Sequence, residues 1–119
     1  MFNELLGKTI NEIKGLKKDN DEVYFECSDG TKYKMYHEQD CCEMVYIEDV
    51  YGDVEDVIGS TITMAEEVSN SDDVPLHEYD ESYTWTYYKL ATIKGYLTIK
   101  WYSVSNGYYS EKVYFKRIN

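Results

Sequence analysis

The densest group of side chains able to do chemistry is a short polar segment, residues 37–43, which reads His-Glu-Gln-Asp-Cys-Cys-Glu. Imidazole, thiolate and carboxylate groups all bind zinc, and a thiolate beside an imidazole can act as a nucleophile. An enzyme or metalloprotein centred on His37, Asp40 and Cys41 is therefore one hypothesis. The spacing matches no established zinc pattern and contains no C-x-x-C pair. The sequence favours a loop between two strands, with thiols buried as small apolar groups.

A second set of polar and aromatic residues alternates along residues 82–115. Aromatic rings can stack on a base at about 1–3 kcal/mol, and a lysine ammonium can meet a phosphate. The pattern suits a nucleotide-like small molecule, and the alternative is a tyrosine-rich core with snorkelling lysines. With the polar segment, the candidate ligand-binding residues are His37, Gln39, Asp40, Tyr83, Trp85, Lys100, Asn106 and Tyr108. No catalytic residue, cofactor or metal is expected.

The formal net charge is −11, from 23 acidic and 12 basic side chains, and the isoelectric point is about 4.5. A nucleic-acid backbone would be repelled, which argues against direct DNA or RNA binding. An acidic surface can instead meet a basic protein groove, or simply keep a small protein soluble. The candidate partner-binding residues for that alternative are Glu66, Glu67, Asp72, Asp73, Glu78, Asp80 and Glu81.

The usual signatures of enzymes and of export are missing from the sequence. There is no serine nucleophile elbow, no phosphate-binding glycine loop and no dinucleotide fingerprint. The N-terminal residues show no cationic region followed by a long apolar segment, and no apolar run approaches the roughly 18 residues that span a bilayer. Cys41 and Cys42 are adjacent and poorly placed to bridge each other. We expect a soluble, non-catalytic protein with reduced thiols in a cytosol, without a membrane partner; homo-oligomerisation is left open.

The elements that would position these residues are mostly strands. Three runs within residues 82–115, separated by 94–95 and 105–107, predict a three-stranded antiparallel meander. Alternation around Asp29-Gly30 predicts a hairpin whose one face holds Val23, Phe25, Cys27, Tyr33, Met35 and His37. Further strands are predicted at 8–16, 43–50 and 61–68, a single turn at 3–7, a two-turn helix at 52–59 and a polar loop at 69–81.

These elements predict one domain over residues 1–119 that is mainly β, with one or two short helices. The expected architecture is a single antiparallel, strongly twisted sheet or a partly open barrel of about seven to eight strands.

Several segments carry a resemblance to a known family. They are residues 37–43, the Gly-Asp-Val-Glu-Asp-Val-Ile-Gly of 52–59, the Met-Ala-Glu-Glu of 64–67, the Tyr-Thr-Trp-Thr-Tyr-Tyr of 83–88 and the Ser-Asn-Gly-Tyr-Tyr-Ser-Glu of 105–111. From about His37 onward the chain resembles a family of small phage- and bacterium-encoded proteins described only as a domain of unknown function. Val57-Ile58 and Ser60-Thr61 depart from that family's pattern, in which a Leu-Ile and a small residue followed by proline are expected.

The resemblance implies a mobile-element origin and a polar patch made from the 37–43 loop and the 105–111 turn. By analogy with other small acidic proteins of mobile elements, we expect a counter-defence protein in the host cell cytosol that sequesters a nucleotide-derived immune signal. The alternative is an acidic protein–protein inhibitor that mimics nucleic acid and blocks a host defence nuclease or effector, such as a CRISPR system. A pocket between the 37–43 loop and the meander would favour the first, and an acidic surface the second.

Overall fold

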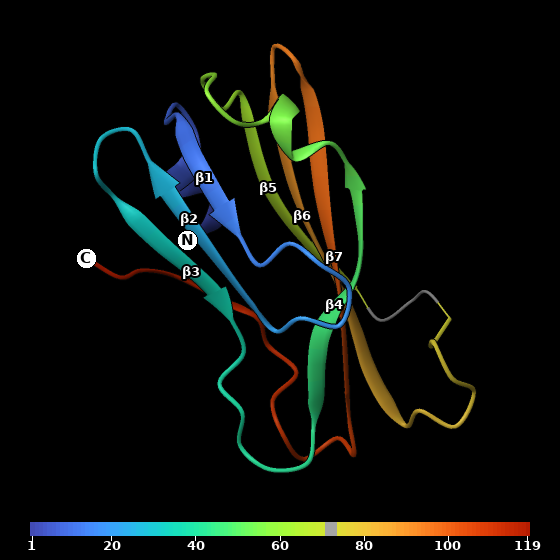
Figure 1. Cartoon of the computed structure of the whole chain (residues 1–119). Helices are drawn as coiled ribbons and strands as arrows, with labels where there is room; N and C mark the ends of the chain where they lie inside the picture. Colours follow the sequence, from blue (N-terminus) through green and yellow to red (C-terminus); the bar gives the residue numbers. More distant parts are fainter. Residues whose placement is uncertain (71–73) are drawn as a thin grey trace.

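The computed structural model describes residues 1–70 and 74–119, which form two antiparallel four-stranded sheets that face each other (Figure 1). The first sheet has the order β1-β2-β3-β8, from Ile10–Lys14, Glu22–Cys27, Lys32–Tyr36 and Tyr114–Arg117. The second has the order β4-β7-β6-β5, from Met44–Gly52, Gly95–Ser105, Ser82–Thr92 and Met64–Asn70. Two 3-10 turns, η1 (Phe2–Leu5) and η2 (Val54–Asp56), complete the elements.

The prediction of a mainly β, antiparallel fold with about eight strands is confirmed. The predicted single sheet or partly open barrel is instead two separate sheets of four strands each. The two-turn helix predicted at 52–59 is only the 3-10 turn η2, whose cap Asp53 accepts a hydrogen bond from the Glu55 amide at 3.0 Å. The turn ends early because Ile58 makes a β-bridge with Ile10. No helix in the described part of the chain is long and apolar enough to cross a membrane.

The core lies between the sheets and follows the period-2 pattern of the strands. The hairpin residues Val23, Phe25, Cys27, Tyr33 and Met35 are all buried, as their alternation predicted. They face the buried residues Ile47, Leu90, Leu97, Ile99 and Trp101 of the second sheet. The Trp101 Nε1–H donates to the Met35 Sδ at 3.2 Å, so a polar contact joins the two sheets inside an otherwise apolar layer.

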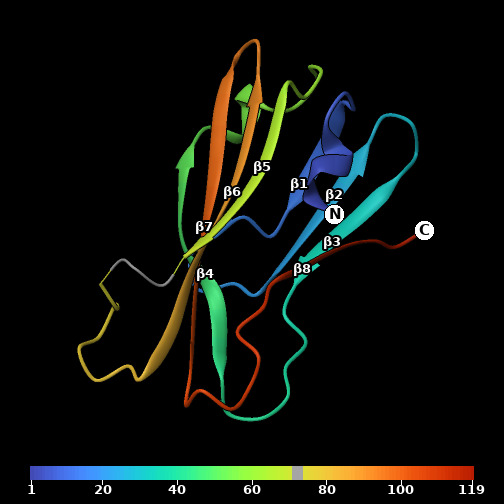
Figure 2. The same cartoon turned by 180° about the vertical axis from the view of Figure 1, so that it is seen from behind.

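Only two of the three strands predicted for the meander lie side by side. Its first two strands form the β6–β7 hairpin, but β8 pairs with β3 in the opposite sheet, where Figure 2 shows it. One edge of β7 pairs with β6 and the other with β4, so no edge is left for a third meander strand. Phe115 on β8 stacks on Tyr33 at 4.9 Å and meets Phe2 and Phe25 edge-on.

The assignment of β8 to the first sheet can be tested through Phe115. Phe115→Ala should lower the free energy of unfolding by about 3 kcal/mol, because it deletes a ring packed among three others. Lys116→Ala, at an exposed position of the same strand, should change it by no more than about 0.5 kcal/mol. Urea unfolding measures both, and equal effects would contradict the packing described.

Candidate functional site

The predicted ligand-binding aromatics lie on the outer face of the second sheet, the face turned away from the core. The register of β6 against β7 places Trp85 opposite Tyr102 and Tyr87 opposite Lys100. The Lys100 Nζ lies 4.4 Å from the Trp85 ring centroid. The Tyr102 ring centroid is also 4.4 Å from the Trp85 ring centroid. The structure therefore brings Trp85 and Lys100 together, but Trp85 is only 5% exposed and Tyr102 is fully buried.

The cover over these rings is part of the chain's own acidic segment, residues 74–81, which we call the anchored acidic loop. The Trp85 Nε1–H donates to the Val74 carbonyl at 3.0 Å, and the Leu76 amide donates to the Tyr102 hydroxyl at 3.1 Å. The same hydroxyl donates to the Asp80 carboxylate at 2.5 Å. Burial and this bond to Asp80 raise the pKa of Tyr102 well above its usual range. The aromatic pair thus holds the loop on the sheet.

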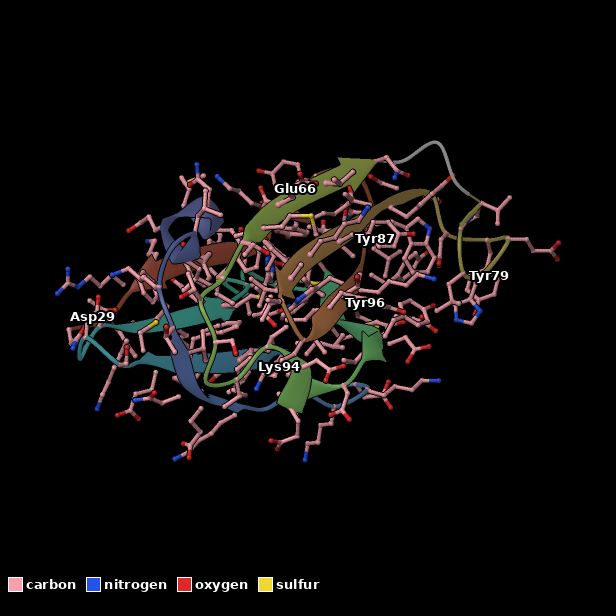
Figure 3. All side chains as sticks on the ribbon, turned by 90° about the horizontal axis from the view of Figure 1, so that it is seen from above. Asp29, Glu66, Tyr79, Tyr87, Lys94 and Tyr96 are labelled. Atoms are coloured by element: carbon pink, nitrogen blue, oxygen red, sulfur yellow. A yellow bond between two sulfur atoms is a disulfide. The ribbon has the colours of Figure 1, made fainter. Side chains whose placement is uncertain are left out.

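The other side of the anchored acidic loop is exposed. Tyr79 is 76% exposed, and its ring stacks on that of His77 with centroids 5.3 Å apart. Figure 3 shows Tyr79 at one extremity of the molecule. Val74 and Leu76 are also exposed, as are the carboxylates of Glu78 and Glu81. The loop therefore presents apolar, aromatic and acidic groups side by side.

The 37–43 segment is organised around the buried carboxylate of Glu43. This carboxylate accepts hydrogen bonds from the His37 Nε2–H at 2.8 Å and from the amides of Asp40 and Cys41, each at 2.9 Å. The Gln39 side-chain amide donates to the Glu43 carbonyl at 2.7 Å. Burial alone would raise the pKa of Glu43, but the hydrogen bonds from His37 and the two amides outweigh it and lower the pKa to about 2.

His37 also ties the segment to the chain just before β8, because its Nδ1–H donates to the Lys112 carbonyl at 2.6 Å. Each ring nitrogen lies within hydrogen-bond distance of an oxygen, the Lys112 carbonyl on one side and the Glu43 carboxylate on the other. In the described part of the chain, no cluster of three His, Cys, Asp or Glu side chains is arranged to hold a metal ion. The imidazole proposed as a ligand or base already has two protein partners.

The structure corrects the expectation for the adjacent cysteines. Cys41 and Cys42 are joined by a disulfide in the exposed loop, although their Cα atoms lie only 3.7 Å apart, less than the usual span of such a bond. The bond joins neighbouring residues, so it closes only a small ring and links no separate elements. Cys27 is a free, buried thiol, and burial raises its pKa.

The remaining candidate ligand residues are dispersed. Tyr83 is half-buried on the outer face, 6.4 Å from the Tyr102 ring. Asn106 and Tyr108 lie in an exposed turn after β7, where the Asn106 side chain accepts from the Tyr108 amide at 2.9 Å. Four cavities of the described residues have linings that include none of Trp85, Lys100 and His37. The structure does not gather the predicted set around one of these pockets.

The candidate acidic residues do not share one surface. Glu66, Glu78 and Glu81 are exposed on the outer face or on the loop, whereas Asp80 is the acceptor that fixes the loop to Tyr102. Glu67 has the opposite parity to Glu66 and faces the inner side of the sheet, opposite Tyr88. Asp72 and Asp73 lie outside the described residues.

Sequence reasoning did not single out Glu43 as the centre of its loop. A signal was present, because Glu43 has the same parity as Val45 and Ile47, which point into the core. A carboxylate in phase with buried positions predicts a buried, hydrogen-bonded group.

The anchoring of the acidic loop can be tested with Tyr102→Phe, which keeps the ring and removes the hydroxyl. The Leu76 amide then loses its acceptor, so its hydrogen exchange should accelerate at least about tenfold while the sheet amides stay protected. Tyr46→Phe, on the adjacent strand at 6.2 Å from the Tyr102 ring, is the matched control. Unchanged exchange at Leu76 in Tyr102→Phe would contradict the anchoring.

The lowered pKa of Glu43 predicts a specific pH dependence. Because the folded-state pKa, about 2, lies below the ordinary value of 4.5, the carboxylate stabilises the fold fully above about pH 4.5. That stability is lost as the pH falls toward 2. Glu43→Gln should have a lower urea midpoint at pH 7 and a shallower loss of stability between pH 4.5 and 2. If both proteins show the same acid dependence, Glu43 does not hold a low pKa.

A family model described as a domain of unknown function (DUF7448) matches residues 3–115, a span that includes the 37–43 segment, the anchored acidic loop and both sheets. No curated protein and no solved structure matches the chain. The match covers nearly the whole length, beyond the part from His37 onward that carried the resemblance. The chain therefore belongs to the DUF7448 family, a domain of unknown function.

Proposed function

We propose that the protein is a non-catalytic binding protein whose anchored acidic loop occupies a basic surface on another protein. The observation that carries this proposal is the triple attachment of the loop to Trp85 and Tyr102. These rings are the feature that suggested a nucleotide site. With Lys100 over the Trp85 ring and the loop across its edge, the ring has little open face for a base to stack on.

The attachment favours binding by an ordered surface. A loop already held in one conformation loses less conformational entropy when it binds, so more of the contact energy appears as affinity. Tyrosine is enriched among the residues that dominate protein interfaces, and Tyr79 stands exposed at the loop's tip. The carboxylates of Glu78 and Glu81, within a chain of net charge −11, would steer a basic partner toward the loop.

The partner class follows from the charge and from the resemblance to phage-encoded proteins. A basic surface of the kind that binds nucleic acid is the complement of this loop, and the protein would act there as a nucleic-acid mimic. We place the function in counter-defence, with a host defence nuclease or effector such as a CRISPR system as the target. Trapping of a nucleotide-derived signal is the less supported function. It needs an exposed aromatic surface, whereas the loop covers the Trp85 and Tyr102 rings.

The proposal is tested by capture from a host lysate with Glu78→Gln/Glu81→Gln as the variant. A basic protein captured by the natural chain at low salt should bind at least about tenfold more weakly to the variant, because two steering charges are lost. Binding should also weaken steeply as salt rises.

The matched control is Glu12→Gln/Glu26→Gln, which removes the same charge from two exposed, register-paired positions of the first sheet. It should capture the partner as well as the natural chain does. If both double variants weaken capture equally, overall charge is responsible and the loop is not the binding surface. Capture of no basic protein would overturn the proposal altogether.

A further inference from the structure

The inner face of the second sheet is divided into an apolar and a polar half. Near the β6–β7 turn its residues are core, including Tyr88, Leu90, Leu97 and Ile99. Farther from the turn, the inward positions of β5, β6 and β7 other than the core residue Trp101 carry a hydroxyl or a carboxylate: Glu67, Ser69, Ser82, Thr84, Thr86, Ser103 and Ser105. Of these residues Thr86 and Ser103 are buried, whereas Glu67 and Ser69 on the edge strand β5 are exposed. Inner faces of packed sheets are ordinarily apolar, and departures from that rule at buried positions are expected at functional sites.

The segment between β7 and β8 forms a wall beside this polar half. The Glu111 carboxylate accepts hydrogen bonds from the hydroxyls of Ser82 at 2.5 Å, Thr84 at 2.8 Å and Ser105 at 2.6 Å. A cleft of about 350 Å³ lies between this segment and strands β5 and β6. Its lining residues are Glu67, Ser69, Thr84, Thr86, Tyr88, Ser110, Glu111, Lys112 and Val113.

The cleft keeps unused hydrogen-bonding capacity. The hydroxyls of Ser69 and Thr86 lie 3.2 Å apart and can each make further bonds. The Glu67 carboxylate interacts with the Tyr88 hydroxyl and is exposed on the cleft side of β5, where it can accept further bonds. In the same polar half, the Ser103 hydroxyl is fully buried and has no hydrogen-bond partner among the described residues. That hydroxyl is not among the lining groups of the cleft.

Charge and polarity restrict what the cleft can hold. A phosphate would meet two carboxylates, Glu67 and Glu111, against the single ammonium of Lys112. An apolar molecule would leave the hydroxyls of the cleft without hydrogen-bond partners. A cation would find Glu111 already engaged by three hydroxyls, and the Lys112 ammonium among the lining groups would oppose it. A neutral molecule with several hydroxyls satisfies all of these groups at once.

We propose that this cleft binds the vicinal diol of a sugar ring, with Glu67 as the carboxylate that accepts from both ring hydroxyls and the Ser69–Thr86 pair beside it. Its volume lies in the range of small-molecule sites. A diol of this kind occurs in free saccharides and in the ribose of nucleosides. The cleft uses the inner face of β5 and β6, opposite to the face that carries the anchored acidic loop, so the inference is independent of the proposed function.

The test is saturation-transfer NMR and calorimetry on the full chain with glucose, galactose, mannose and ribose in one arm, and adenosine and guanosine in the other. At least one sugar or nucleoside should bind. Glu67→Ala should weaken that binding at least about tenfold, because a charge-assisted pair of hydrogen bonds is lost. Glu66→Ala, the neighbouring residue of opposite parity, is the matched control and should bind as the natural chain does.

Thr86→Val gives a second variant that keeps the shape and removes one hydroxyl; it too should weaken binding, with circular dichroism confirming that it folds. Glu78→Gln/Glu81→Gln should leave sugar binding unchanged, which separates this result from the test of the loop. The proposal is overturned if no diol binds, if Glu66→Ala weakens binding as much as Glu67→Ala, or if adenosine monophosphate binds better than adenosine.

Discussion

The register of the β6–β7 hairpin is the constraint on which both candidate sites depend. Eleven residue pairs, from Ser82 with Ser105 to Thr92 with Gly95, fix which side chains face outward and which face inward. Trp85 and Tyr102 meet on the outer face to hold the acidic loop, while the hydroxyls of Thr84 and Thr86 turn inward to the cleft. A slip of one residue along one strand would bring that strand's inward residues to the outer face. It would dismantle the core and both candidate sites together, so pairing across the whole hairpin fixes these sites as well as the fold.

The strands themselves could be predicted because alternation and turn residues are local signals. Residues 22–27 and 32–36, and the β6–β7 hairpin, lie where the pattern placed them. The division into two sheets could not be predicted, because a strand's partner is chosen by edges and rings distant in sequence. Phe115 packs on Tyr33, 82 positions away along the chain, and that contact carries β8 to the first sheet. The predicted helix at 52–59 failed for the same reason, since Ile58 pairs with Ile10.

The candidate site was predictable in its composition and not in its geometry. Alternation correctly brought Trp85 and Lys100 to one face, yet a sequence does not say whether an aromatic face meets a ligand or another part of the chain. Here the answer lies in two backbone groups, the Val74 carbonyl and the Leu76 amide, which have no side-chain signature. The inward hydroxyls were visible as the alternate positions of β6. Serine and threonine at such positions carry a weaker sequence signal of binding than the tyrosine and tryptophan of the other face.

One contact links the 37–43 loop to the 105–111 turn, the two segments from which the resemblance implies a polar patch. His37 is fixed by the buried Glu43 and donates to the carbonyl of Lys112, the residue next to Glu111. Glu111 in turn holds the hydroxyls of both β6 and β7. The two segments therefore form one hydrogen-bonded chain that positions the wall of the cleft, and His37 acts on the cleft through Lys112 without lining it. Because a buried polar group that loses its hydrogen-bond partner is costly, loss of either His37 or Glu43 would loosen this wall before it disturbed the apolar half of the core.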